Sequence, residues 1–284
     1  MTATDGRCLP GSVRVARRFH LGRTAFHVVV ATIYGFLFLP LIFIAFISVF
    51  SNRIISFPAD GYTLGWYLNI FSQVQFVNGF VMSFQVALLA MVCGCILGTL
   101  AAIALTKFDF RGKTFLNTLL MSPLIVPGIV AGTALYVFYV QITELFGLRL
   151  AASLPGLAFA HITITIPWTV RLVATSMGGA DRSVEEAAMN LGANAWTTFT
   201  KVTLPLIRPG IVAAALFSFI VSFGNLEMSL FLVGPGKTTL PIAILQYLSF
   251  NLDPTIAAVS VVEIVVIGVA MLVTNRFVRI SSFV

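Results

Sequence analysis

The feature that most constrains this chain is a series of six apolar segments, each long enough to cross a membrane as a helix. The hydrocarbon core of a bilayer is about 30 Å thick, so a helix that crosses it needs about 20 apolar residues. A soluble fold could not bury this much apolar surface, because 58% of the 284 residues are hydrophobic and only 10% are charged. We therefore predict an all-α, polytopic membrane protein with six transmembrane helices. The predicted spans are His27–Phe50, Val77–Thr106, Phe115–Val140, Leu154–Met177, Gly210–Val233 and Thr255–Asn275.

Basic residues are distributed unevenly between the two sides of these spans. Of the 17 Lys and Arg residues, all but Arg53, Arg149 and Lys237 lie on the same side as the N-terminus. Because Lys and Arg are retained preferentially in cytoplasmic loops, we expect both termini to be cytoplasmic. The first apolar segment is longer than a signal-peptide core of about 7–15 residues, so we expect it to be retained as a helix. The chain then divides into a basic N-terminal tail, residues 1–26, and a six-helix membrane domain, residues 27–284.

The connection between the fourth and fifth spans, residues 178–209, has a readable internal plan. Ser183 and Glu186 have the spacing of a capping box, in which a Ser caps a helix N-terminus and a Glu three residues later bonds back to it. Asp181 and Glu185 add negative charge near that N-terminus, which the helix dipole favours. We expect a short helix from here to Leu191, and Gly192 is typical of the left-handed residue that ends a helix.

A second short helix is predicted in the same loop, over Ala195–Lys201, with Asn194 as its cap. We expect Leu204-Pro205 to end this helix, and Pro209-Gly210 to begin the fifth span. Many side chains of the loop are apolar, so the two helices pack on the membrane domain, dock on a cytoplasmic partner, or do both. The apolar residues are Ala187, Ala188, Leu191, Trp196, Phe199, Val202 and Leu204.

The loop also carries a spaced motif, made of Glu186-Ala187-Ala188, Gly192 and the run Val202-Thr203-Leu204-Pro205. It resembles the EAA signature of ABC-importer permeases, which reads EAA, three residues, Gly, nine residues, Ile, one residue, Leu-Pro. Every spacing matches, and Val202 replaces the Ile. Three further runs resemble the spermidine/putrescine branch of that family, and most closely its second membrane subunit. These runs are Met121–Pro127, His161–Pro167 and Phe231–Pro235.

The resemblance implies a type I ABC importer permease fold, in which the cytoplasmic loop docks on a separate ATPase as a coupling helix. The implied partners are two ATPase subunits, a second and non-identical permease subunit, a periplasmic substrate-binding protein and the lipid bilayer of a bacterial inner membrane, with no nucleic acid. ATP and Mg would bind to the partner ATPase, and this chain would hold no cofactor. The implied coupling residues are Ser183, Glu186, Ala187, Ala188, Gly192, Val202, Leu204 and Pro205.

Two acidic residues, Glu227 and Glu263, fall within predicted spans, where an ionisable group is costly and is a candidate for function. In the spermidine/putrescine branch, the position equivalent to Gly224-Asn225 usually carries a pair of acids. Glu227 lies three residues beyond Gly224, so we predict that Asn225, Glu227 and Glu263 border a cation pathway. A packing role for Glu227 stays open, and another small amine, an opine-like compound or a phosphonate stays possible as the substrate.

Several other motifs do not fit a catalytic or metal site. Gly234–Thr239 imitates the end of a phosphate-binding loop, but Phe231 stands where that motif requires its first Gly. Cys93 and Cys95 have no nearby His or Cys that would complete a metal site. His161 is interpreted as an interfacial, hydrogen-bonding residue near the outer end of the fourth span. We therefore expect a transport subunit and not an enzyme.

The alternative function is that of a self-sufficient secondary transporter or channel driven by an ion gradient. Carriers of that class often contain inverted repeats and helices broken at the midplane of the membrane. The sequence shows no convincing repeat, and such a carrier would have no use for a structured EAA loop. Pro123 and Pro127, which each remove a helix hydrogen bond, are expected to loosen or kink the third span.

Overall fold

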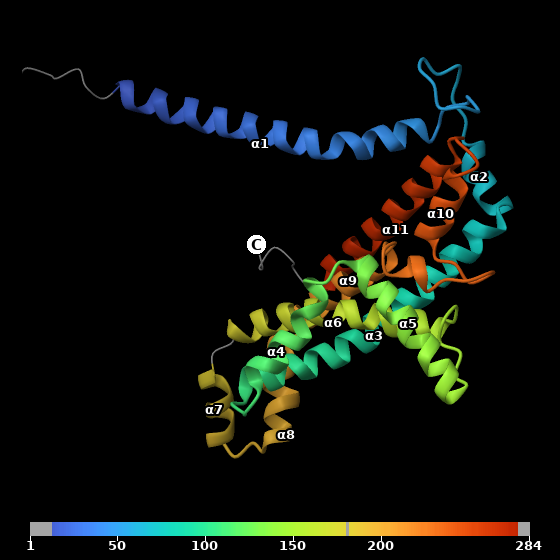
Figure 1. Cartoon of the computed structure of the whole chain (residues 1–284). Coiled ribbons are helices and arrows are strands. Elements are labelled where there is room, and N and C mark those ends of the chain that lie inside the picture. The colour runs from blue at the N-terminus through green and yellow to red at the C-terminus, as the bar shows by residue number, and fades with distance from the viewer. Residues whose placement is uncertain (1–12, 180–181, 278–284) are drawn as a thin grey trace, which may run out of the picture.

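The computed structural model describes residues 13–179 and 182–277, and this part of the chain is mostly helical. Six of its helices are long and apolar enough to cross a membrane, which confirms the predicted fold class. α1 (Val13–Ile47) lies apart from the other helices along most of its length (Figure 1). Residues 1–12 of the predicted N-terminal tail are outside the described residues, and α1 already begins at Val13.

The centre of the fold is a bundle of three helices, α3 (Val74–Lys107), α6 (Leu154–Gly178) and α9 (Leu204–Phe223). Small residues allow these helices to approach closely, as is common in membranes. A Cβ added at Gly98 of α3 would lie 2.5 Å from the Cβ of Thr169 on α6, and one added at Gly210 of α9 would lie 2.5 Å from the Cβ of Ser176. The core therefore depends on backbone proximity as well as on apolar burial.

The predicted third span, Phe115–Val140, is wrong as a continuous helix. The structure has α4 (Lys113–Met121), a short 3-10 turn η1 (Ser122–Leu124) and then α5 (Gly128–Phe146). Pro127 precedes α5 with an extended backbone, at ψ 135°, and a residue that precedes a proline is itself disfavoured in the helical conformation. The proline pair therefore separates two helices, and the candidate span is α5 alone.

The predicted fifth span, Gly210–Val233, is displaced. α8 (Ala195–Thr198), a π-helical turn η2 (Phe199–Thr203) and α9 follow one another without a break, so neither Leu204-Pro205 nor Pro209-Gly210 ends or restarts a helix. Pro205 is tolerated because it lies in the first turn of α9, which follows the wider π-helical turn. The candidate span runs from Ala195 to Phe223 and stops ten residues before the predicted end.

The remaining elements complete the two ends of the bundle. α2 (Gly65–Ser72) and α10 (Leu240–Leu248), which the sequence did not predict, lie near α11 (Thr255–Phe277) at one end (Figure 1). α4, α7 (Arg182–Asn190) and α8 lie at the other end (Figure 1). Apart from the third and fifth, the candidate spans agree with the predicted ones to within about five residues.

Candidate coupling loop and transport pathway

The first helix of the loop, α7, ends in the left-handed turn that the sequence predicts. Gly192 has φ +90°, a conformation that costs other L-residues about 1–2 kcal/mol. The amide of Ala193 donates to the carbonyl of Ala188 at 3.1 Å, and the amide of Gly192 donates to that of Met189 at 2.9 Å. This pair of bonds is a Schellman motif, which satisfies two carbonyls at the end of the helix.

The start of α7 differs from the capping-box prediction. α7 begins at Arg182, so Ser183 lies within its first turn and does not precede the helix. The cap position, residue 181, is outside the described residues. The second helix begins as predicted, because the Asn194 side-chain oxygen accepts a hydrogen bond from the Thr197 amide at 2.8 Å.

The two helices of the loop expose a set of apolar side chains, which we call the coupling face: Val184, Met189, Leu191 and Trp196. Leu191 is 89% exposed and Trp196 is 73% exposed. Phe199, Val202 and Ala188 are half-buried, whereas Glu186, Ala187, Leu204 and Pro205 are exposed. The apolar residues of the loop therefore divide into some that pack within the protein and others that face outward, and such outward patches mark interaction sites.

Sequence reasoning missed a polar cluster that fixes α7 to the bundle. The ammonium group of Lys107, the last residue of α3, lies 2.7 Å from Oε1 and 2.8 Å from Oε2 of Glu185. Thr203, which directly precedes α9, donates to Oε1 of Glu185 at 2.6 Å. Lys107 lies 78 positions from Glu185 and 96 positions from Thr203. The sequence therefore indicated only that Lys107 lies on the basic side of the membrane.

At the opposite end of α9 the chain leaves the helix at Gly224 and forms the short 3-10 turn η3 (Ser229–Phe231). The Asn225 side-chain oxygen accepts from the Met228 amide at 2.9 Å, and Ser229 Oγ donates to the Asn225 carbonyl at 2.9 Å. Asn225 therefore organises this segment, residues 224–228, which we call the membrane break. Glu227 lies in this break. The sequence prediction, which placed it within a helical span, is wrong on this point.

Glu227 is exposed and its side chain lies directly against Gly128, at the start of α5, where no Cβ could be added without a clash. A Cβ at Gly132, one turn further along α5, would lie 2.9 Å from the Met228 carbonyl oxygen. The interruption before α5 thus faces the membrane break. Glu263 of α11 is half-buried and borders the same break, since a Cβ at Gly224 would lie 3.6 Å from its Oε1.

His161 of α6 is buried among the helices, at 1% exposure. Its predicted hydrogen-bonding role is confirmed. Nδ1 lies 2.8 Å from Ser222 Oγ on α9, and Nε2 lies 3.0 Å from Ser229 Oγ on η3. A neutral imidazole can donate through one nitrogen and accept through the other, so this one ring links α6 to both sides of the membrane break.

The family of the chain follows from comparison with known sequences. The sequence model of the family described as "Binding-protein-dependent transport system inner membrane component" matches residues 90–282, which include both the coupling loop and the membrane break. The chain belongs to this family. It is a membrane-spanning permease subunit of a binding-protein-dependent ABC importer, and the alternative of a self-sufficient carrier fits less well.

Three relatives of this permease are each 28% identical to it over the aligned residues. The putrescine transport system permease protein PotI of Escherichia coli (strain K12) aligns over 83% of this chain and 84% of its own length. The spermidine/putrescine transport system permease protein PotC of Haemophilus influenzae aligns over 92% and 97%. PhnV of Salmonella paratyphi A, named for 2-aminoethylphosphonate transport, aligns over 92% and 96%.

The fold of the permease is shared with solved importers. One is a bacterial alginate ABC transporter in complex with an alginate pentasaccharide-bound periplasmic protein, with a TM-score of 0.72 at 16% identity. That likeness covers 93% of this chain and 96% of the solved one. The type I importer permease fold is thereby confirmed for the described part of the chain.

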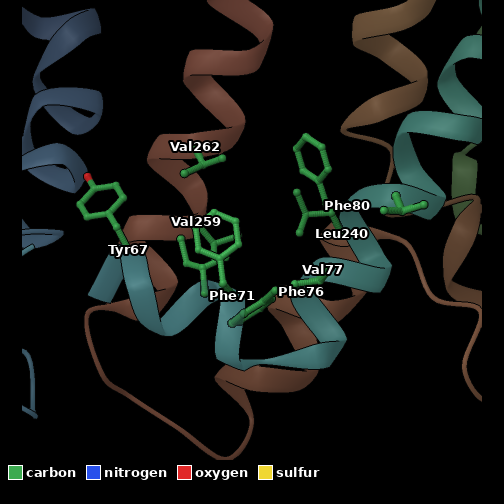
Figure 2. Close-up of a pocket in the computed structure, with 10 residues that line it drawn as sticks. Tyr67, Phe71, Phe76, Val77, Phe80, Leu240, Val259 and Val262 are labelled. Atoms are coloured by element: carbon green, nitrogen blue, oxygen red, sulfur yellow. The ribbon is translucent and has the colours of Figure 1, made fainter. Parts of the chain in front are cut away.

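A hollow of about 460 Å³ lies among α2, α3, α10 and α11 of the permease. Figure 2 shows Phe71, Phe76 and Val259 around it, with Phe80 and Leu240 at its other side. Its ten lining residues are apolar except for the Tyr67 hydroxyl, and none is acidic. This hollow does not suit a cation, so the membrane break is the better candidate for a pathway.

The segment that imitates a phosphate-binding loop is a tight turn in the permease. Gly234 and Lys237 form an isolated bridge, with the Lys237 amide donating to the Gly234 carbonyl at 2.9 Å. Gly236 has φ +73° within that turn. The segment is therefore built around its own backbone.

Proposed function

We propose that this permease moves a small cationic amine across the bacterial inner membrane, with both of its termini in the cytoplasm. The carboxylate of Glu227, exposed at the membrane break, is the observation that carries the substrate class. A carboxylate beside a membrane pathway attracts a cation and is costly to keep there without a function. The names of PotI, PotC and PhnV support an amine as the substrate, because putrescine, spermidine and 2-aminoethylphosphonate each carry an amino group. The distribution of Lys and Arg supports the orientation.

The proposed complex contains two ATPase subunits, a second and non-identical permease subunit and a periplasmic substrate-binding protein. ATP and Mg bind to the ATPases, and this chain is a transport subunit without a nucleotide site of its own. The coupling face supports docking on the ATPases, since Leu191 and Trp196 present apolar surface away from the membrane bundle. Glu186 is exposed beside this face and takes part in the docking.

Reconstitution in lipid vesicles tests the proposal. The permease is co-purified with its ATPase, partner permease and binding protein, and uptake of labelled putrescine is measured with and without ATP. We expect uptake that requires both ATP and the binding protein. Uptake by the permease alone, driven by an ion gradient, would instead support the secondary carrier. Competition with 2-aminoethylphosphonate separates a diamine site from an aminophosphonate site.

The docking role is tested by Glu186→Arg in the same vesicles. A reversed charge beside the coupling face is expected to lower putrescine transported per ATP hydrolysed at least tenfold. Ala195→Arg, at an exposed position outside the EAA motif, is the matched control. Coupled transport at the wild-type ratio in the Glu186→Arg variant would contradict the proposed role of the loop.

A further inference from the structure

Three polar side chains from separate parts of the sequence meet where α7 approaches the central bundle. Lys107 Nζ donates to both carboxylate oxygens of Glu185, at 2.7 and 2.8 Å, and to Thr203 Oγ1 at 3.1 Å. Thr203 Oγ1 in turn donates to Glu185 Oε1 at 2.6 Å. Each residue therefore bonds to the other two, and the geometry of the ammonium group is fixed by two partners from different elements.

This cluster differs from an ordinary surface ion pair. The side chains of Lys107 and Glu185 are 26% and 21% exposed, and Thr203 is 2% exposed. The pair Lys113–Asp109 lies close by in sequence and has the same chemistry at 2.8 Å, but its side chains are 36% and 98% exposed. Exposed pairs contribute little because water and salt screen them. The Lys107 cluster is shielded on one side and cross-linked by a buried hydroxyl.

The cluster also joins α7 directly to α3, two elements that otherwise have little contact. The backbone of α7 packs against α8 and η2, while α3 packs against α6 and α9. Lys107 ends α3, Glu185 lies in the first turns of α7, and Thr203 is the last residue before α9. The three side chains thus attach α7 to the ends of two of the three helices that form the central bundle.

We propose that Lys107, Glu185 and Thr203 form a latch that transmits movement of α7 to α3 and α9 together. The inference rests on the proposed function, in which an ATPase moves α7. Without Lys107, α7 would still rest on η2 and so move α9, whereas α3 would be moved only indirectly, through its packing on α6 and α9. Lys107 is a positioning residue in this scheme, because it contacts neither the ATPase nor the substrate.

The first test measures coupling in the reconstituted complex. Lys107→Met keeps most of the side-chain length and removes the charge. We expect at least a fivefold fall in putrescine transported per ATP hydrolysed, with the ATPases bound at the wild-type stoichiometry. Lys113→Met, which breaks the exposed pair on the same connection, is the matched control and is expected to leave the ratio unchanged.

Rescue separates the latch from a general loss of structure. The exchange Lys107→Glu with Glu185→Lys reverses the pair, and the Thr203 hydroxyl can still accept from the lysine and donate to the glutamate. The exchanged pair is expected to recover at least half of the wild-type transport per ATP, while each single reversal stays at least fivefold below it. An exchange that performs no better than the single reversals would overturn the proposal.

The second test needs no ATPase and no substrate. In full-length permease with its three cysteines replaced, spin labels at Phe108, after α3, and at Asn190, at the end of α7, report the distance between the two elements. Both positions are exposed. We expect one narrow distance distribution in the otherwise unchanged permease and a broad one in Lys107→Met. An unchanged distribution would show that Lys107 does not hold α7.

The outcomes distinguish the latch from the proposed function. A wild-type complex without ATP-driven uptake refutes the proposed function, and the latch as a coupling device falls with it. ATP-driven uptake in which Lys107→Met retains the wild-type ratio refutes the latch alone, whatever the spin labels show. A lower ratio together with a broadened distance, and rescue by the exchanged pair, supports both.

Discussion

Among the helices of this permease that end near a glycine, α7 beside Gly192 and α9 at Gly224 are held in different ways. Gly192 has φ +90°, and its turn is closed by hydrogen bonds within six residues of sequence. Gly224 has φ −90° and ψ 9°, which other residues adopt without strain. The membrane break has local hydrogen bonds at Asn225, but it is also held by distant elements, by His161 of α6 and by the close approach of α5 at Gly128.

The comparison teaches which helix ends a sequence can reveal. A turn that depends on its own backbone leaves a local pattern of residues, whereas a break that depends on tertiary contacts does not. The following variants test this difference, in order of expected effect.

His161→Ala should have the largest effect on stability. The buried hydroxyl of Ser222 loses its partner, that of Ser229 keeps only its bond to the Asn225 carbonyl, and a cavity replaces the ring. We therefore expect the free energy of unfolding to fall by about 2–3 kcal/mol. Denaturant unfolding in detergent, followed by circular dichroism, measures it. His27→Ala on the exposed part of α1 is the control. A loss no larger than that of the control would mean that His161 does not hold the membrane break.

Glu227→Gln should leave the break folded but weaken transport. Removing the negative charge is expected to lower kcat/KM for putrescine uptake about tenfold, which corresponds to about 1.4 kcal/mol. Glu144→Gln, at an exposed position near the far end of α5, is the matched control. Unchanged uptake kinetics in the Glu227 variant would leave a packing role as its explanation.

Gly192→Ala should affect the coupling loop locally. An alanine at φ +90° costs about 1–2 kcal/mol, although a Cβ there would meet no neighbouring atom. Hydrogen exchange at the amides of α7 measures the effect, and we expect faster exchange near Met189 with no change in α6. Protection equal to that of the wild type would show that the turn tolerates a side chain.

Gly224→Ala should have the smallest effect. The backbone there permits alanine, and the added Cβ would be in ordinary contact with Glu263, at 3.6 Å. We expect the free energy of unfolding to change by less than about 0.5 kcal/mol in the assay used for His161→Ala. A loss as large as that of Gly192→Ala would remove the distinction between the two helix ends.

The correct and incorrect predictions made from the sequence follow the same division between local signals and tertiary contacts. Apolar length located α1, α3, α6 and α11, and the Asn194 cap and the Gly192 turn are local signals that the sequence displays. The third and fifth spans were placed wrongly because apolar composition continues through both interruptions, whereas the helical conformation of the backbone stops at Pro127 and at Gly224.

The site residues show the same limit. Glu227 was recognised as an acid in an apolar region, but its position against Gly128 depends on two helices that the sequence does not place together. The contact between Lys107 and Glu185 spans 78 residues, and that between Lys107 and Thr203 spans 96. No periodicity or motif could have paired these residues, because their meeting is a property of the packed bundle.

The continuous run from Ala195 to Phe223 has a mechanical consequence. With 29 helical residues and a rise of about 1.5 Å each, it is a rod about 43 Å long. Neither of its internal prolines interrupts the run. The second helix of the coupling loop and Phe223 therefore lie at opposite ends of one continuous helical segment. The run therefore connects the coupling loop at one end with the membrane break, where Glu227 lies, at the other.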